Sequence, residues 1–241
     1  MKISIIVPAF NEEKLIADSL RSMRQAAQSF ARRGWETEII VCDNNSTDAT
    51  AEMARAGGAR VVFEPVNQIA RARNTGAAAA SGDWFLFVDA DSRPTPELFA
   101  EVAGQIESGR CLAGGCTIRM DEQHFVVGLV TALWNGVSRM TKWAAGAFIF
   151  CQGEAFRKIG GFNLELFASE ELDLSKRLKK LARARGQKMV ILHRHPLLTS
   201  ARKMRLYSLG EMARFFKNAV LRPRQTVTNR EACGPWYDGR R

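Results

Sequence analysis

Short apolar segments alternate with amphipathic segments through residues 1–100, and this alternation limits the fold more than any other feature of the chain. The apolar segments have the length of buried strands, whereas the segments between them repeat apolar residues at helical spacing. We expect strands at 3–7, 38–42, 60–63 and 84–88 and helices at 13–33, 47–56 and 68–80, with a further helix starting at Thr95 and Pro96. This order predicts an α/β fold with a mostly parallel, Rossmann-like central sheet and helices on both faces.

The second half of the chain is less regular. Apolar runs predict strands at 111–120, 147–151 and 189–192, and helical spacing predicts helices at 125–143 and 169–185. With 241 residues, of which 46% are hydrophobic, the chain suits one large domain better than two. We expect that domain to cover residues 1–200, with residues 201–241 as a basic amphipathic C-terminal extension.

The cysteines form neither a disulfide pattern nor a zinc pattern. Their number is odd and no Cys-x-x-Cys pair occurs, so we interpret them as small buried hydrophobic side chains in a reducing compartment. The N-terminal segment lacks the features of a signal peptide, and the sequence contains no apolar run long enough for a transmembrane helix. We therefore expect a cytoplasmic location. The five residues are Cys42, Cys111, Cys116, Cys151 and Cys233.

Positive charge is concentrated in the last part of the chain. Residues 1–173 hold 17 Lys and Arg against 22 Asp and Glu, a net charge of −5, whereas residues 174–241 hold 18 against 3, a net charge of +15. A basic end indicates an anionic partner, although a plainly solvated surface explains it equally well. Residues 207–224 mix apolar with basic side chains as a membrane-surface helix does. No stacking platform or known motif accompanies the charge, so we expect no nucleic-acid partner.

Polar segments directly follow three of the predicted strands, at residues 8–12, 43–48 and 89–91. In a parallel sheet the carboxyl ends of the strands share one edge, where ligands bind, so we expect these segments to converge. Asp89-Ala90-Asp91 places two carboxylates one residue apart at a strand end. Hard oxygen ligands of this kind suit Mg²⁺ or Mn²⁺ together with nucleotide phosphates, although a single Asp-x-Asp is often only a turn.

The other candidate residues each carry a functional and a structural interpretation. Asp43 can accept hydrogen bonds from a ribose or a base, or it can close an Asx turn. No glycine-rich phosphate loop is present, which argues against dinucleotide dehydrogenases and P-loop enzymes and leaves Arg71 and Arg73 to meet a diphosphate. Glu170 and Glu171 begin a predicted helix with Ser169 as N-cap. There they are favoured by the helix dipole, or one of them is a general base.

Taken together, these segments resemble the family 2 glycosyltransferases, which have the GT-A fold. Six motifs occur in the family's order between about residues 2 and 180. They are Pro8-Ala9-Phe10-Asn11-Glu12, Asp43 to Thr50 (D-N-N-S-T-D-A-T), Ala72-Arg73-Asn74-Thr75-Gly76 with Gly82-Asp83, Asp89-Ala90-Asp91, Phe156 to Phe162 (F-R-K-I-G-G-F) and Glu170 to Leu178 (E-E-L-D-L-S-K-R-L). Any one of these motifs is weak evidence, but six in order are specific.

The resemblance implies roles for individual residues. Residues 1–91 would form the donor half of the domain and residues 92–200 the acceptor half. Glu171 stands where the family has a catalytic Asp, a departure that leaves Glu170 as a substitute. Donor-binding residues would be Pro8, Ala9, Phe10, Glu12, Asp43, Arg71, Arg73, Asp89 and Ala90; metal ligands would be Asp91 and Asp89, with His193 or His195 as a third.

The implied reaction moves a sugar from a UDP- or GDP-sugar to a hydroxyl acceptor, with Mn²⁺ or Mg²⁺ as cofactor. A single base on the acceptor side implies inversion at the sugar, and a retaining outcome stays open because the sequence does not fix where the acceptor docks. Residues 125–143 form a core helix, line an acceptor pocket or touch a membrane; a lipid-linked or cell-envelope acceptor, at the inner face of the cell membrane, fits this apolar helix and the basic extension. The alternatives are a sugar nucleotidyltransferase and a catalytically inactive nucleotide-sugar-binding regulator. A homodimer formed through the apolar second half is equally compatible with the sequence.

Overall fold

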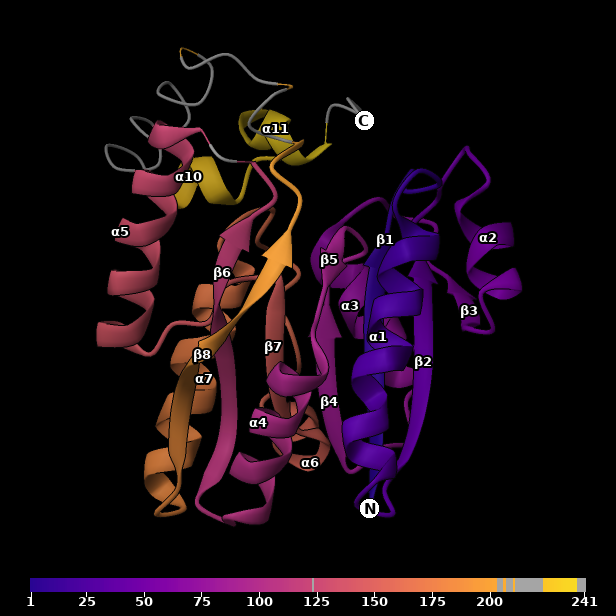
Figure 1. Cartoon of the computed structure of the whole chain (residues 1–241). Coiled ribbons are helices and arrows are strands. Elements are labelled where there is room, and N and C mark those ends of the chain that lie inside the picture. The colour runs from indigo at the N-terminus through magenta and orange to yellow at the C-terminus, as the bar shows by residue number, and fades with distance from the viewer. Residues whose placement is uncertain (123, 203–205, 207–209, 211–222, 238–241) are drawn as a thin grey trace.

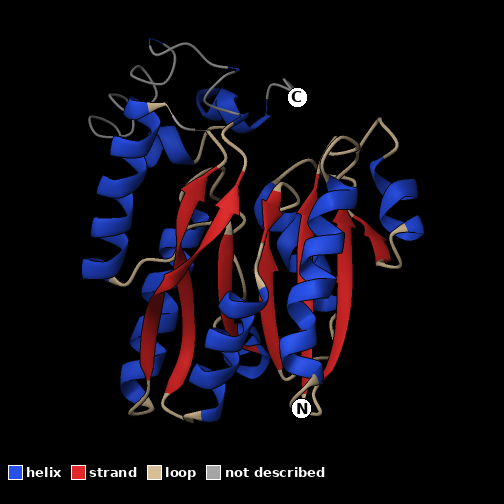
Figure 2. Cartoon of the chain, in the orientation of Figure 1, coloured by secondary structure: helices blue, strands red, loops and turns tan. Residues whose placement is uncertain are grey.

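The computed structural model describes residues 1–241 except 123, 203–205, 207–209, 211–222 and 238–241. The described part of the chain is built around an eight-stranded sheet in the order β3-β2-β1-β4-β7-β6-β8-β5 (Figures 1 and 2). The strands are β1 (Lys2–Ala9), β2 (Glu36–Asp43), β3 (Arg60–Phe63), β4 (Trp84–Val88), β5 (Ser92–Arg93), β6 (Cys111–Met120), β7 (Phe148–Gln152) and β8 (Lys188–Thr199). The first four pair in parallel, β6 pairs in parallel with β8, and β7 and β5 run antiparallel to their neighbours. The predicted mostly parallel α/β sheet is confirmed.

Helices cover both faces of this sheet. On one face α1 and α4 pack over Ile3, Ile5 and Val7 of β1; on the other, α3, α6 and α7 pack over a second apolar cluster that includes Ile6. Because alternate β1 side chains point to opposite faces, one strand serves both clusters. The helices are α1 (Ile16–Ala31), α2 (Thr50–Ala56), α3 (Ile69–Ala78), α4 (Pro96–Glu107), α5 (Phe125–Thr141), α6 (Gly153–Lys158), α7 (Glu170–Ala184), α10 (Pro223–Val227), η1 (Glu231–Cys233) and α11 (Gly234–Tyr237).

Most element predictions agree with the structure, and the differences have local causes. The helix predicted at 47–56 begins only at Thr50, because the hydroxyl of Ser46 accepts a hydrogen bond from Asn11 instead of capping a helix. Ser169 precedes α7 as predicted, but it has a left-handed backbone and its side chain makes no cap. The strand predicted at 189–192 extends to Thr199, and β5 and α6 were too short to be predicted.

Helix α5 is not a core helix. Only Val127, Thr131 and Ser138 are buried, while Phe125 is 81% and Met140 85% exposed. Figure 1 shows the helix standing beside the edge of the sheet that contains β6 and β8. Of the three interpretations of residues 125–143, the structure therefore excludes a core helix. Among the described residues, none of the helices has the length and hydropathy needed to cross a membrane.

All five cysteines are buried and unpaired, which confirms their interpretation as small core side chains. Burial raises the pKa of the Cys42 and Cys111 thiols to about 12 and that of Cys233 to about 11. These thiols are therefore protonated and poorly reactive in the folded chain.

The described part of the C-terminal extension folds back onto the domain. The Phe167 amide donates a hydrogen bond to the Val227 carbonyl (2.7 Å), and the Cys233 thiol donates to the Thr226 carbonyl (3.3 Å). In Figure 1, α10 and α11 lie above the upper ends of β6 and β8, on the side of the sheet at which β1 and β4 also end. Most of the amphipathic helix predicted at 207–224 lies outside the described residues.

Candidate donor and transfer site

A pocket opens to solvent at the carboxyl edge of β1, β2 and β4. The end of β1 and the loops after β1, β2, β3 and β4 supply most of its wall, and α3 and Tyr237 supply the rest. The lining residues are Pro8, Ala9, Phe10, Glu12, Asn44, Asn67, Ile69, Ala72, Asp89, Ala90, Asp91 and Tyr237. The structure thus brings together six of the nine predicted donor-binding residues, together with Asp91.

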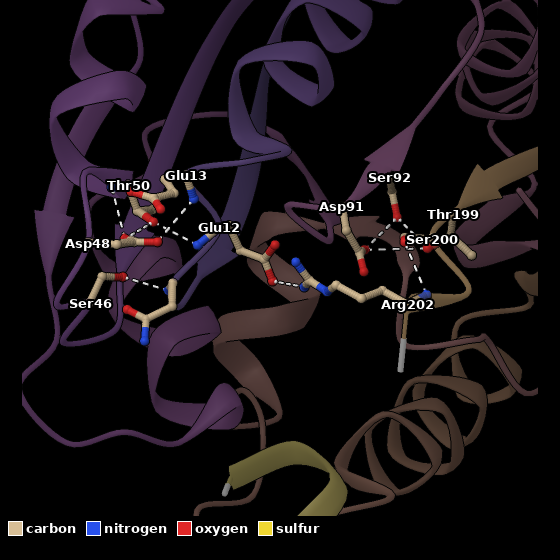
Figure 3. A network of polar contacts seen from close by, with 11 residues as sticks. Glu12, Glu13, Ser46, Asp48, Thr50, Asp91, Ser92, Thr199, Ser200 and Arg202 are labelled. Carbon is tan, nitrogen blue, oxygen red and sulfur yellow. Dashed lines mark hydrogen bonds and ion pairs between the residues drawn. The ribbon is translucent and has the colours of Figure 1, made fainter. Parts of the chain in front are cut away.

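The loops after β1 and β2 are tied together by side-chain hydrogen bonds (Figure 3). The Ser46 hydroxyl accepts from the Asn11 amide (3.0 Å), and the Thr50 hydroxyl accepts from the Glu12 amide (2.7 Å). Asp48 accepts from the amides of Glu13 and Thr50. Burial works to raise the pKa of Asp48, but a hydrogen bond from the Thr50 hydroxyl, together with those from the amides, outweighs it and holds the pKa below its usual value. The polar residues of the first two motifs therefore shape the pocket edge.

The two carboxylates of the Asp-x-Asp segment are held in different ways. Asp89 accepts a hydrogen bond from the Arg73 guanidinium at 3.0 Å. Asp91 lies 3.4 Å from the hydroxyls of Ser92 and Thr199, which β5 and β8 bring together by pairing at this register. The β5–β8 pair thus fixes the segment that follows β4.

Arg73 is the central residue of this region, and it lies beneath the pocket wall instead of on it. Its side chain is 1% exposed and donates to Asp89, to Glu170 (2.7 Å) and to the Gly146 carbonyl (2.8 Å). The guanidinium also stacks on the Phe162 ring, 5.2 Å from its centre. Burial alone would lower the pKa of Arg73, but Asp89 and Glu170 raise it, so the side chain stays cationic. Arg73 therefore lies behind Asp89, which lines the pocket, and its predicted place near the base or the phosphates stays a prediction.

The two glutamates at the start of α7 differ in environment. Glu170 is buried and paired with Arg73. Glu171 is half-buried and packs against Gly146. A Cβ added to Gly146 would lie 3.4 Å from Arg73 and 3.6 Å from the Glu171 carboxyl carbon. Burial and the neighbouring Glu170 raise the pKa of Glu171 to about 8. Glu171 is therefore the glutamate able to exchange a proton near neutral pH.

Two further motifs interlock behind the site. The Asn74 side chain donates to the Phe162 carbonyl and accepts from the Phe162 amide, both at 2.9 Å. Gly161, at φ 70°, leaves no room for a Cβ against Asn74. Gly76 packs α3 directly on Ile6, where a Cβ would approach to 2.6 Å. These residues hold α3, and with it Arg73, in place, and none of them lines the pocket.

Besides Arg73, Glu170 and Glu171, four further predicted site residues lie away from the pocket wall. Asp43 accepts from the Ser46 amide (3.1 Å), as in the turn interpretation, and Arg71 donates to Gln68. His193 lies in a surface hollow beside α5, and His195 lies near Glu97 of α4. Within the described residues no group of three or more metal-binding side chains forms. The structure therefore does not bring either histidine together with Asp89 and Asp91.

The extension contributes two residues that the sequence did not indicate. Arg202, just after β8, donates to Glu12 at 2.6 Å and lies close enough to Asp91 to feel its charge (Figure 3). Tyr237 lines the pocket from the other side. Both positions lie outside the motifs, and basic residues are frequent in residues 201–241, so no pattern distinguished Arg202.

Two carboxylates at a strand end suit a hard divalent cation that takes its remaining ligands from a diphosphate and water. Asp91 and Asp89 fit this role by their chemistry and by their place on the pocket wall. A nucleoside placed along residues 8–10 would direct its phosphates toward these carboxylates. Glu171 lies behind the carboxylates, next to Arg73, which donates a hydrogen bond to Asp89. The arrangement suits transfer of a group attached to a nucleoside diphosphate.

Comparisons with known proteins agree with this geometry. The model of the family described as glycosyl transferase family 2 matches residues 4–158. The dolichol-phosphate mannosyltransferase of Pyrococcus furiosus is 31% identical over 123 residues, which are 48% of this chain and 33% of that protein. This chain thus matches about a third of the length of that relative.

Solved structures share the fold. The mannosyltransferase PcManGT from Pyrobaculum calidifontis, in complex with GDP-Man and Mn²⁺, superposes with a TM-score of 0.66 at 20% identity, covering 91% of this chain and 61% of that one. Glucosyl-3-phosphoglycerate synthase from Mycobacterium tuberculosis, in complex with Mn²⁺, UDP and glucosyl-3-phosphoglycerate, gives 0.65 at 22% identity, covering 95% and 81%. The GT-A fold expected from the sequence is confirmed.

Proposed function

The chain belongs to glycosyl transferase family 2, and on this basis we propose that it transfers a sugar from a nucleoside-diphosphate sugar to an acceptor hydroxyl, with a divalent cation at the diphosphate. The observation that carries the proposal is the pocket at the strand ends, whose wall includes the Asp-x-Asp segment and residues 8–10. Both solved relatives described above contain a nucleotide or a nucleotide sugar together with Mn²⁺.

Each side chain of the site has a role in this proposal. Pro8, Ala9 and Phe10 would contact the nucleoside, and Asp91 and Asp89 would hold Mn²⁺ or Mg²⁺. The cation, when bound, stabilises negative charge on the departing diphosphate. Arg202 would add a positive charge on the same side, because it already lies between Glu12 and Asp91.

Glu171 is proposed as the general base. It would accept the proton of the acceptor hydroxyl while the hydroxyl oxygen attacks the anomeric carbon and the bond to the diphosphate breaks. A single base on the acceptor side implies inversion of configuration. Glu170 cannot take this role without giving up its ion pair with Arg73, so we assign it a structural role. Within this proposal residues 1–91 form the donor half and residues 92–200 the acceptor half.

Replacing Asp91 by alanine is expected to abolish metal-dependent nucleotide binding. Thermal unfolding of the wild type with UDP or GDP, each with and without Mn²⁺, should show a metal-dependent rise for one nucleotide, since saturation a hundredfold above Kd adds about 2.7 kcal/mol. Asp18→Ala is the matched control, because Asp18 pairs with Arg21 on the exposed side of α1 and does not line the pocket. A wild type whose unfolding temperature responds to neither nucleotide would contradict the proposed function.

We propose further that the acceptor is lipid-linked and that α5 touches an anionic membrane surface. The exposed side of α5 is apolar, and Arg139 and Lys142 follow at its C-terminal end, an arrangement suited to a membrane interface. The exposed apolar residues of this helix are Phe125, Val126, Leu129, Val130, Leu133, Val137 and Met140.

Co-sedimentation with liposomes tests this contact. The protein should bind vesicles containing phosphatidylglycerol at least about tenfold better than neutral vesicles, because buried apolar area and charge attraction add. Leu129→Glu/Leu133→Glu should remove most of the binding, whereas Phe63→Glu, at an equally exposed position on β3, should not. Equal binding to neutral and anionic vesicles would exclude the membrane proposal.

A further inference from the structure

The far end of the chain supplies one wall of the pocket. Tyr237, the last residue of α11, lines the same space as Pro8 and Phe10 of the loop after β1 and Ile69 and Ala72 of α3. No part of the family match covers it, because that match ends at residue 158. The described segment 223–237 therefore contributes to the pocket wall through Tyr237, although none of the six motifs includes it.

Tyr237 is held in place by several independent contacts. Its ring meets the Phe167 ring edge-on at 5.5 Å, and its hydroxyl accepts a hydrogen bond from the Ile69 amide at 3.4 Å. The Arg230 guanidinium lies 5.9 Å from the ring centre. One turn earlier, Cys233 is fully buried. An aromatic ring fixed in this way is preorganised, so a ligand need not order it on binding.

The position of Tyr237 indicates which part of a ligand it would meet. Its hydroxyl contacts Ile69, the first residue of α3, and α3 packs on β1 and β2. Asp89 and Asp91 follow β4, which lies on the other side of β1 in the sheet. Besides Tyr237, the pocket wall away from Asp89 and Asp91 includes the apolar residues Pro8, Phe10 and Ile69 together with Asn44 and Asn67. Flat apolar walls suit a nucleoside better than a diphosphate.

We propose that Tyr237 is a donor-binding residue whose ring packs against the nucleoside, so that the C-terminal segment from Pro223 to Tyr237 is part of the donor site. The inference rests on the proposed function, since it assumes a nucleotide in this pocket. Stacking of a base on an aromatic ring is sequence-tolerant, and its loss on alanine substitution lowers affinity substantially. The hydroxyl contributes less, because it is already bonded to the Ile69 amide.

The test measures Kd of the wild type, Tyr237→Ala and Tyr237→Phe for UDP and GDP in the presence of Mn²⁺ by titration calorimetry. For the nucleotide that the wild type binds, Tyr237→Ala should bind about tenfold more weakly and Tyr237→Phe within about threefold. Inorganic pyrophosphate with Mn²⁺, which has no nucleoside, should bind all three proteins with affinities within about twofold of one another.

Cys233 reports whether the segment remains docked in each variant. Its thiol is buried, so reaction with a thiol reagent should stay slow as long as the segment keeps its place. If Tyr237→Ala exposes Cys233, Tyr237→Leu, which refills part of the space, replaces it in the comparison.

Unchanged or tighter nucleotide binding by a docked Tyr237→Ala would overturn the inference, and tighter binding would mean that the ring occupies the nucleoside's place. An equal loss for pyrophosphate would also overturn it, because the effect would then not depend on the nucleoside. Absence of nucleotide binding already in the wild type would instead count against the proposed function on which the inference rests.

Discussion

Replacing Glu171 by glutamine is expected to lower kcat about 10²–10⁴-fold, the usual contribution of a general base. Glutamine keeps the shape of the side chain against Gly146 but cannot accept a proton from the acceptor hydroxyl. Nucleotide affinity should change little, because Glu171 does not line the pocket. Single-turnover transfer with the nucleotide sugar identified by the binding screen measures the effect on the chemical step.

The same residue predicts the pH dependence. Burial and Glu170 raise the pKa of Glu171 to about 8, and the base acts only when deprotonated. The value of kcat/KM should therefore rise about tenfold per pH unit below pH 8 and level off above it. The free energy of unfolding has the opposite pH dependence. A carboxyl group whose pKa is raised in the folded state stabilises the fold below its ordinary pKa of 4.5, and this stabilisation is lost as the pH rises through 8. Glu171→Gln should remove both dependences.

Asp173→Asn is the matched control for Glu171→Gln. It lies in the same first turn of α7 and neutralises one carboxylate, but its partner is Arg177, on the same helix and partly exposed. Its kcat should stay within about twofold of the wild type, since partly exposed ion pairs contribute little. If Asp173→Asn and Glu171→Gln reduced kcat equally, the loss would reflect the charge of the helix start, and Glu171 would not be the base.

The order of the motifs was enough to predict the fold and the pocket edge. Polar residues that follow several buried strands come together at one edge of the sheet only if those strands are parallel. The alternation of strands with helices predicts parallel strands. For this reason the sequence predicts Pro8, Phe10 and Asp91 at one edge of the sheet, and the structure places all three on the pocket wall.

Contacts between distant segments could not be predicted in the same way. A motif indicates that Arg73 matters, but its burial between Asp89 and Glu170 depends on how α3 and α7 pack, which local spacing does not encode. The same holds for Tyr237, which reaches Ile69 across 168 positions of sequence. The two histidines show the converse. The strand predicted at 189–192 put them at a strand end, but β8 continues to Thr199, so they lie within the strand and apart from the aspartates.

Replacing Arg73 by methionine is expected to reduce the free energy of unfolding by about 3–5 kcal/mol, the cost of breaking a buried ion pair by removing one partner. Methionine fills a similar volume but leaves the buried Glu170 carboxylate and Asp89 without their shared cation, and it leaves the Gly146 carbonyl without its donor. Since domains are stable by about 5–15 kcal/mol, much of the margin would be lost. Urea unfolding followed by circular dichroism measures the change.

Two companion variants separate the buried network from charge in general. Arg21→Met removes an exposed partner of Asp18, with both side chains more than half exposed, and should cost at most about 0.5 kcal/mol. Arg73→Met/Glu170→Gln removes one of the stranded carboxylates and should recover part of the loss, because the penalty comes from unpaired buried charge. A double variant no more stable than Arg73→Met would mean that the guanidinium acts through packing on Phe162 instead of through its ion pairs. If the double variant instead recovers stability but not sugar transfer, Arg73 also has a role in activity. Asp89 and Gly146 would in that case still lack the hydrogen bonds from Arg73 that hold them beside Glu171.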